Sequence, residues 1–196
     1  MGWYGWFPME CYHGVVSIDH AVDGSLDDGQ RLIDLGGGRG YIEKDWGRNF
    51  PKTWIWLQAN LFDQSAVSLT ASVARIPFYG RVFPGFIIGL LLGSRLIRFA
   101  TYLGSTLEKV HLDGNKVQII VRSKEAVLEI TGVQGRTVLL PAPTLGQGMI
   151  PRVGESIDAL VHIRLRDARG AIIYEGESKQ AGMEIEGDTT ILITGP

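Results

Sequence analysis

Cysteine is nearly absent from this sequence, because Cys11 is the only one among 196 residues. One thiol cannot form a disulfide within the chain, and such scarcity fits a reducing compartment. We therefore expect a cytoplasmic protein, whose attachment to a membrane would be peripheral at most.

Long hydrophobic runs and an excess of positive charge are missing as well. The most apolar stretch, FPGFIIGLLL at 83–92, is far shorter than the roughly 20 residues that span a bilayer. The formal net charge of −2 gives no electrostatic reason to bind nucleic acid. The four histidines show no zinc-ligand spacing, so no metal site is expected. The sequence thus predicts no integral membrane segment and no nucleic-acid partner.

Short stretches of alternating apolar and polar residues dominate what is present, and 26 glycines lie between them. This pattern is typical of β-strands joined by turns, whereas helical periodicity is almost absent. Turn chemistry at 113–115 and 167–170 predicts two hairpins. We expect an all-β chain, either a sandwich or an antiparallel barrel, and favour the barrel because closure removes free strand edges.

The expected strands can be placed along the chain. They cover residues 10–20, 32–34, 40–44, 54–62, 67–76, 85–91, 96–102, 106–111, 116–121, 127–133, 135–140, 156–167, 172–177 and 190–194. Pro141 and Pro143 should end one strand, since proline cannot donate to a ladder. Residues 143–154 are then expected to form a loop that could act as a lid.

Residues 39–60 hold three of the five tryptophans and are the most informative segment. Successive side chains of a strand point to opposite faces, so Trp54, Trp56, Gln58 and Asn60 should share one face. Large rings beside amides would suit an apolar ligand with one polar end. We expect this face to point into the barrel interior.

The same alternation puts Tyr41, Glu43 and Asp45 on one face of the preceding strand. Two neighbouring carboxylates raise each other's proton affinity, and burial raises it further. A neutral carboxylic acid in an apolar pocket can protonate a substrate. The alternative is an ion-pair network at a barrel rim, formed by Arg39, Glu43, Lys44, Asp45 and Arg48.

His13 allows two interpretations, a hydrogen-bonded core residue or a member of a catalytic site. It shares a predicted strand face with Cys11, but this pair gives little support for a nucleophilic site. The glycine run at 36–40 lacks the lysine and serine or threonine of a phosphate loop, and a tight bend explains it better.

Several motifs together resemble the tocopherol cyclase family. They are GWYGW at 2–6, MECYHG at 9–14, GRGYIEKDWG at 38–47, the W-x-W-x-Q-x-N alternation at 54–60, ARIP at 74–77, FATY at 99–102 and AGME at 181–184. The resemblance implies a lipocalin-like β-barrel and kinship with carotenoid hydratase-type proteins, which share a tandem two-barrel plan. Residues 1–196 would form one barrel domain, the second half of such a protein. Residues 1–62 would include strands that complete a preceding barrel, and that barrel or a second chain would be a partner.

The chemistry implied by the resemblance is acid-initiated closure of a prenylated quinol to a chromanol, which needs no redox cofactor or metal. Protonation of the alkene gives a tertiary cation, which the phenol oxygen captures. Chemistry and strand faces together suggest Glu43 or Asp45 as the acid, His13 as the residue that orients or deprotonates the phenol, Tyr41, Trp54 and Trp56 as cation-facing rings, and Gln58 and Asn60 as holders of the ring oxygens. The alternatives are a non-catalytic, lipocalin-like carrier of a prenyl lipid or other hydrophobe, and a structural fragment without a ligand.

Overall fold

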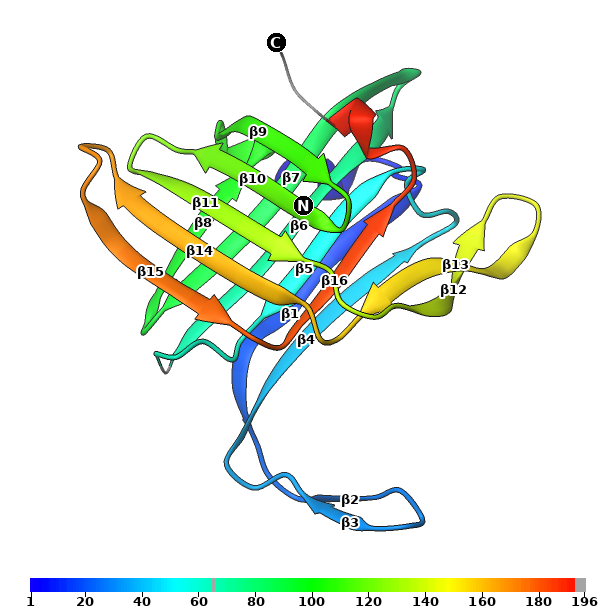
Figure 1. Ribbon diagram of the computed structural model, residues 1–196. Helices are drawn as coiled ribbons and strands as arrows, with labels where there is room; N and C mark the ends of the chain where they lie inside the picture. Colours follow the sequence, from blue (N-terminus) through cyan, green and yellow to red (C-terminus); the bar gives the residue numbers. More distant parts are fainter. Residues whose placement is uncertain (65, 193–196) are drawn as a thin grey trace.

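The computed structural model describes residues 1–64 and 66–192, which are mostly in β-strands (Figure 1). The strands are β1 Cys11–Val22, β2 Ser25–Asp27, β3 Leu32–Asp34, β4 Gly38–Gly47, β5 Trp54–Ala59, β6 Val67–Phe78, β7 Arg81–Leu92, β8 Arg95–Ala100, β9 Thr106–Asp113, β10 Lys116–Arg122, β11 Ala126–Val133, β12 Val138–Thr144, β13 Gly148–Ser156, β14 Leu160–Asp167, β15 Ile172–Ser178 and β16 Ala181–Glu186. Three short 3-10 helices occupy Gly2–Trp6, Thr101–Leu103 and Thr189–Leu192. None of the helices in these ranges has the length and apolar character to cross a membrane.

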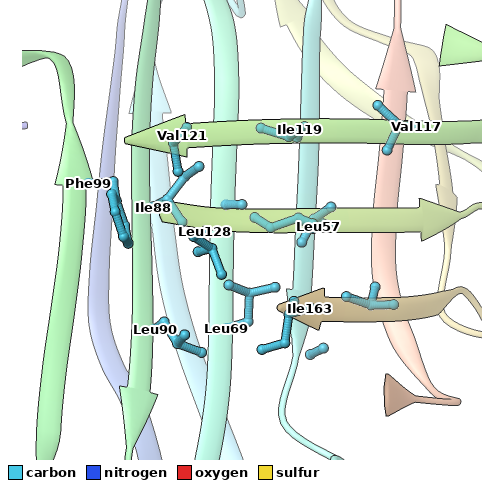
Figure 2. Packing of buried hydrophobic residues seen from close by; sticks show 14 of the residues in the cluster. Leu57, Leu69, Ile88, Leu90, Phe99, Val117, Ile119, Val121, Leu128 and Ile163 are labelled. Carbon is cyan, nitrogen blue, oxygen red and sulfur yellow. The ribbon is translucent and has the colours of Figure 1, made fainter. Parts of the chain in front are cut away.

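Two antiparallel sheets enclose the main core. One has seven strands in the order β12-β13-β16-β5-β6-β7-β8, and the other has five in the order β15-β14-β11-β10-β9. The strands of the smaller sheet cross in front of the larger one in Figure 1. Aliphatic side chains from both sheets meet between them, among them Leu57, Leu69, Ile88, Ile119, Leu128 and Ile163 (Figure 2).

The all-β, antiparallel fold class expected from the sequence is confirmed. The barrel is not closed, because the strand ladders of the described residues form separate sheets. An isolated bridge between Phe62 and Ser178 connects the region after β5 with the end of β15.

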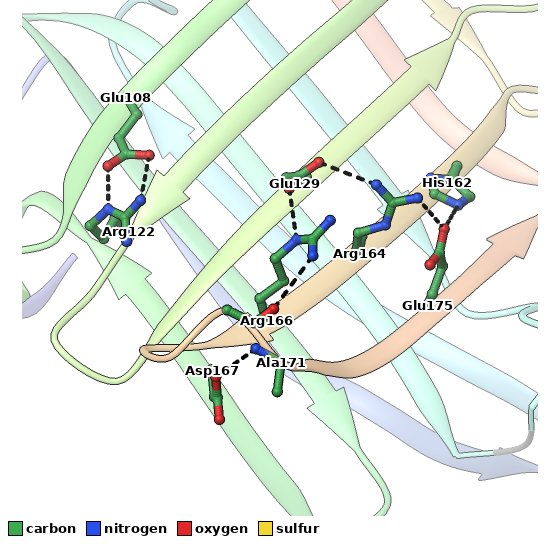
Figure 3. Close-up of polar contacts among 10 residues, drawn as sticks. Glu108, Arg122, Glu129, His162, Arg164, Arg166, Asp167, Ala171 and Glu175 are labelled. Carbon is green, nitrogen blue, oxygen red and sulfur yellow. Dashed lines mark hydrogen bonds and ion pairs between the residues drawn. The ribbon is translucent and has the colours of Figure 1, made fainter.

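Charged side chains cover the outer face of the five-stranded sheet (Figure 3). Arg164 lies 2.6 Å from Glu175 and 3.8 Å from Glu129, and Arg166 lies 3.3 Å from Glu129. Their sequence neighbours on the inner face, such as Leu165, are fully buried. Exposed ion pairs of this kind contribute little to stability and mark a solvated surface.

A third layer lies on the other face of the seven-stranded sheet. It is the two-stranded ribbon formed by β1 and β4, which pair antiparallel. Ser68 on β6 donates a hydrogen bond to the carbonyl of Ile18 at 2.7 Å, and Arg39 donates to the carbonyl of Asn60 at 3.2 Å. Beyond these contacts the ribbon continues into the small β2–β3 arm, which extends away from the sheets in Figure 1.

The direction of the tryptophan face differs from the expectation. Ile55, Leu57 and Ala59 point into the interior between the two sheets, where all three are fully buried. Trp54 and Trp56 therefore point to the opposite face of the sheet, toward the β1–β4 ribbon. The expected position inside the barrel is wrong, because the aliphatic face of the strand already fills that interior.

Several strand boundaries also differ from the expectation. β12 runs through Pro141 and Pro143, which an edge strand tolerates because its outer N–H groups have no partner to meet. The expected loop at 143–154 is largely the β12–β13 hairpin, and β2 and β16 were not expected at all. A 3-10 helix takes the place of the expected strand from residue 190, and residues 193 and 194 lie outside the described ranges.

The core position of Leu57 can be tested by truncation. Leu57→Ala should lower the free energy of unfolding by about 2–5 kcal/mol, because the lost contacts leave a cavity between the sheets. Leu139→Ala on β12, where the side chain is 60% exposed, should change it by less than about 0.5 kcal/mol. Urea unfolding followed by circular dichroism measures both, and equal losses would contradict the described core.

Candidate functional site

A cavity of about 310 Å³ lies between the seven-stranded sheet and the β1–β4 ribbon. Its wall includes ribbon residues, sheet residues and parts of the N-terminal segment. The residues that matter most for its chemistry are Cys11, His13, Glu43, Asp45, Trp54, Trp56, Glu155 and Glu184. Apolar side chains such as Phe50, Ile76, Phe83 and Phe86 complete much of the surface. The cavity is therefore an apolar space with a few polar groups, as small-molecule sites usually are.

Ribbon pairing brings His13 and two carboxylates together. His13 is directly opposite Asp45 in the β1–β4 register, and Glu43 is opposite Val15, two positions along. His13 Nδ1 lies 2.7 Å from Asp45 Oδ1 and 3.3 Å from Glu43 Oε1. The side chains are 15%, 33% and 9% exposed for His13, Asp45 and Glu43. The alternation expected for this segment thus places both carboxylates toward the cavity.

The pKa values of these three groups are shifted together. Burial disfavours the charged imidazole, but hydrogen bonds to Asp45 and Glu43 and their negative charges raise the pKa of His13 to about 9. Burial would raise the pKa of Glu43, yet the hydrogen bonds and charge of His13 hold that pKa below its usual value. Burial raises the pKa of Asp45, with a contribution from Glu43. At neutral pH the ring is protonated, and Asp45 is the carboxylate with the greater proton affinity.

Tyr41 fixes Glu43 from the side away from His13. Its hydroxyl donates a short hydrogen bond to Glu43 Oε2 and lies 2.9 Å from the hydroxyl of Thr70 on β6. Burial, followed by the charge of Glu43, raises the pKa of Tyr41, so the phenol stays protonated. Glu43 is therefore held on one oxygen by the Tyr41 hydroxyl and on the other by its ion pair with His13, while Asp45 is the more exposed carboxylate.

The sheet contributes a second acidic wall, which sequence reasoning missed. Glu155 on β13, Glu184 on β16, Trp56 on β5 and Ser72 on β6 are successive partners across the sheet and all line the cavity. Trp54 Nε1 donates a hydrogen bond to Glu184 Oε2 at 2.6 Å. The AGME motif at 181–184 was the only signal in the sequence, and no periodic pattern marked β16 as a strand.

Burial raises the pKa of Glu184 to about 7, although the Trp54 hydrogen bond opposes this shift. The charges of Glu155, Asp45 and Glu186 add to the increase. No ion pair reaches Glu184 within residues 1–64 and 66–192. A carboxyl group that is largely protonated just below neutral pH thus lies on the wall opposite His13.

Two buried donors in the cavity wall have no protein partner within the described part of the chain. They are Nε2 of His13 and Nε1 of Trp56. Buried polar groups are nearly always satisfied, by water or a ligand where the protein offers nothing. Both donors are therefore free to hold an oxygen atom of a bound molecule.

The other expected site residues lie elsewhere. Gln58 and Asn60 are not among the residues that line the cavity. Arg39 pairs with Asp19 at 2.8 Å, and Lys44 lies over the Trp46 ring. The rim network considered for the acidic pair does not form among the described residues, because His13 takes the place of the basic side chains.

Cys11 lies in the cavity wall, but its sulfur stays protonated at neutral pH. Burial, with the charge of Asp45, raises the pKa of Cys11 to about 12. His13 is engaged with the two carboxylates, so it does not activate the sulfur. A nucleophilic role would require the thiolate, which is negligible at neutral pH.

Within the described residues, one cluster can be compared with a metal site. It is formed by His13, Glu43 and Asp45, since one atom of each lies within 4.8 Å of the others. A metal ligand must offer an unprotonated nitrogen. The shared proton on His13 Nδ1 instead favours a hydrogen-bonded acid–base cluster.

A second hollow, of about 380 Å³, shares Met1, His13, Ile87 and Tyr102 with the cavity. Its wall is largely apolar and includes Val15, Ile18, Ile88, Leu96 and Phe99. The two spaces together could hold a polar head near His13 and an apolar chain beyond it.

The His13 cluster predicts a measurable titration. In an NMR titration the His13 ring should titrate near pH 9, and Asp45→Asn should move its pKa down toward the ordinary value of about 6.5. Because the folded-state pKa is the higher one, the stabilisation from protonated His13 is complete below about pH 6.5 and is lost as the pH rises through about 9. Asp113→Asn, at the end of β9, is the control and should leave His13 unchanged. A His13 midpoint below 7 in the unaltered protein would contradict the cluster.

Comparison with known proteins confirms the resemblance predicted from the motifs. A family model described as tocopherol cyclase-like matches residues 1–187. The chloroplastic tocopherol cyclase of Zea mays is 25% identical over 204 residues, which cover 95% of this chain and 41% of the maize protein. The probable chloroplastic tocopherol cyclase of Oryza sativa subsp. japonica is 24% identical over 198 residues, 95% of this chain and 42% of the rice protein.

Among solved structures, kievitone hydratase from Nectria haematococca aligns with a TM-score of 0.49 and 10% identity, over 92% of this chain and 56% of that one. The chain spans about two fifths of the length of the two plant relatives. Since the family model covers nearly the whole sequence, the chain belongs to the tocopherol cyclase-like family.

Proposed function

We propose that this chain catalyses the acid-initiated cyclisation of a prenylated quinol to a chromanol. The observation that carries the proposal is the His13–Glu43–Asp45 cluster at the wall of an aromatic-lined cavity. Membership of the family and the cyclase activity named for the maize relative support the same reaction class.

The cluster is suited to hold the phenolic head of such a substrate. The protonated His13 ring has a free Nε2–H, which can donate to a quinol oxygen. Asp45 lies beside it, is the more exposed carboxylate, and can accept the phenol proton as the ring closes. The lowered pKa of Glu43 argues against its expected role as the neutral acid, and it serves instead to keep His13 charged.

The aromatic wall is suited to the cationic part of the reaction. Trp54 and Trp56 line the cavity, and an indole face stabilises a nearby cation. Apolar surroundings keep water away from a tertiary cation, which would otherwise be hydrated. The adjoining apolar hollow could take the rest of an isoprenoid chain.

Removal of the proton acceptor tests the reaction. With a prenylated hydroquinone as substrate, Asp45→Asn should slow chromanol formation by about 100-fold or more, since general base catalysis typically contributes that much. Quenching of tryptophan emission by the corresponding quinone should persist, because the aromatic wall is intact. Chromatography of the products measures the first effect and fluorescence the second, with Asp113→Asn as the matched control.

Three outcomes would contradict parts of this proposal. Equal turnover by Asp45→Asn and the unaltered protein would remove Asp45 from the reaction. Quenching without any chromanol from the unaltered protein would favour the non-catalytic carrier. An emission spectrum that does not change at saturating lipid would count against both functions.

A further inference from the structure

We propose that Glu184 is the acid that protonates the alkene, across the cavity from the cluster that holds the phenol. This inference rests on the proposed function and assigns one of its steps to a residue on a different layer of the molecule. The argument depends on where Glu184 lies, what holds it, and which bonds the reaction must make.

Position is the first reason. Glu184 belongs to the seven-stranded sheet, whereas His13 and Asp45 belong to the ribbon that covers it. Both groups line the same cavity, and the carboxyls of Asp45 and Glu184 are close enough to influence each other's charge. Addition of a proton and an oxygen to the two carbons of an alkene needs a donor and an acceptor at separate places, and two walls provide them.

The neighbours of Glu184 orient it for this role. The indole N–H of Trp54 holds Oε2 at 2.6 Å, and no other hydrogen bond reaches the carboxyl within the described residues, so Oε1 can carry the proton. Arg152 is the nearby cation on β13, but it lies over the Trp54 ring and donates to the carbonyl of Pro51. The side chain is therefore fixed on one oxygen and unpaired on the other.

Trp56 lies on the same face of the sheet as Glu184, and both line the cavity. Glu184 and Trp56 are direct partners across β16 and β5. A Cβ atom at Gly182 would come within 2.9 Å of the Trp56 ring, so the glycine lets the indole approach β16 closely. A cation formed in the cavity would thus have the indole of Trp56 in the same wall as the acid.

Burial, with the acidic groups around Glu184, favours its protonated form. Glu155 faces it from β13, Asp45 from β4 and Glu186 from its own strand, and all three are acidic. With burial they raise its pKa to about 7. A general acid works best when its pKa lies near the working pH.

The step balances without a co-reactant. The O–H bond of Glu184 breaks as a C–H bond forms on the alkene, which leaves a tertiary cation and a carboxylate. The phenol oxygen then forms the C–O bond, and its O–H proton passes to the Asp45 carboxylate. Exchange with water returns the proton from Asp45 to Glu184, so the product is an isomer of the substrate.

Substitution of Glu184 tests the assignment. Glu184→Gln should slow chromanol formation by about 100-fold or more, and Glu184→Asp should recover part of the rate. In the unaltered protein the rate should fall as the pH rises through about 7, because the acid must be protonated. The residual rate of Glu184→Gln should lack this fall. Glu177→Gln, on the exposed edge strand β15, is the matched control and should behave like the unaltered protein.

A second probe separates this inference from the proposed function. The quinol whose first prenyl alkene is replaced by an epoxide needs only an acid for ring opening. The unaltered protein and Glu177→Gln should open it, and Glu184→Gln should not. The unaltered protein could open the epoxide in a Glu184-dependent way and yet form no chromanol from the alkene substrate. That result would support Glu184 as an acid and overturn the cyclase function. Chromanol formation and epoxide opening at unaltered rates in Glu184→Gln would overturn the acid alone, and an epoxide that no protein opens would overturn it as well.

Discussion

The central strand β5 must bury both of its faces, and the three-layer structure depends on this constraint. Ile55, Leu57 and Ala59 are fully buried between the two sheets, while Trp54 and Trp56 lie under the β1–β4 ribbon. A sheet with one solvated face would leave both indoles in water. The ribbon covers the indoles and so removes that cost. It contacts the sheet at small polar residues such as Ser68 and Thr70. Where the sheet instead carries Trp54 and Trp56, ribbon and sheet enclose the cavity.

Much of the fold followed from the period-two pattern alone. Alternation in residues 39–45 correctly put Tyr41, Glu43 and Asp45 on one face, because successive side chains of a strand point to opposite faces. The layer that covers each face of β5 was harder to predict. Alternation puts Trp56 and Leu57 on opposite faces of β5. It does not say which of these faces the five-stranded sheet covers and which the β1–β4 ribbon covers, because that depends on contacts between distant segments.

In the candidate site, too, some features could be predicted from the sequence, and others depend on contacts between distant segments. Ribbon register brings His13 opposite Asp45, and a lone histidine in a strand did suggest either a site or a core position. Glu184 was missed because β16 is only six residues long and carries a glycine, which weakens any strand pattern. Its partner Trp54 lies 130 positions away in the sequence, so only the folded sheet brings the two together.

The cavity between ribbon and sheet lies mostly outside the hydrophobic interior that folds the domain, and Phe86 borders both. Substitutions that reshape the cavity can therefore alter ligand choice without opening holes among Leu57, Leu69 and their neighbours. Proteins whose ligands occupy the core lack this freedom, since each change of ligand there is also a change of packing. A scaffold of this kind can diversify in substrate while its melting temperature stays nearly constant, and directed evolution of the ribbon residues would have an unusually wide range of folded variants to draw on.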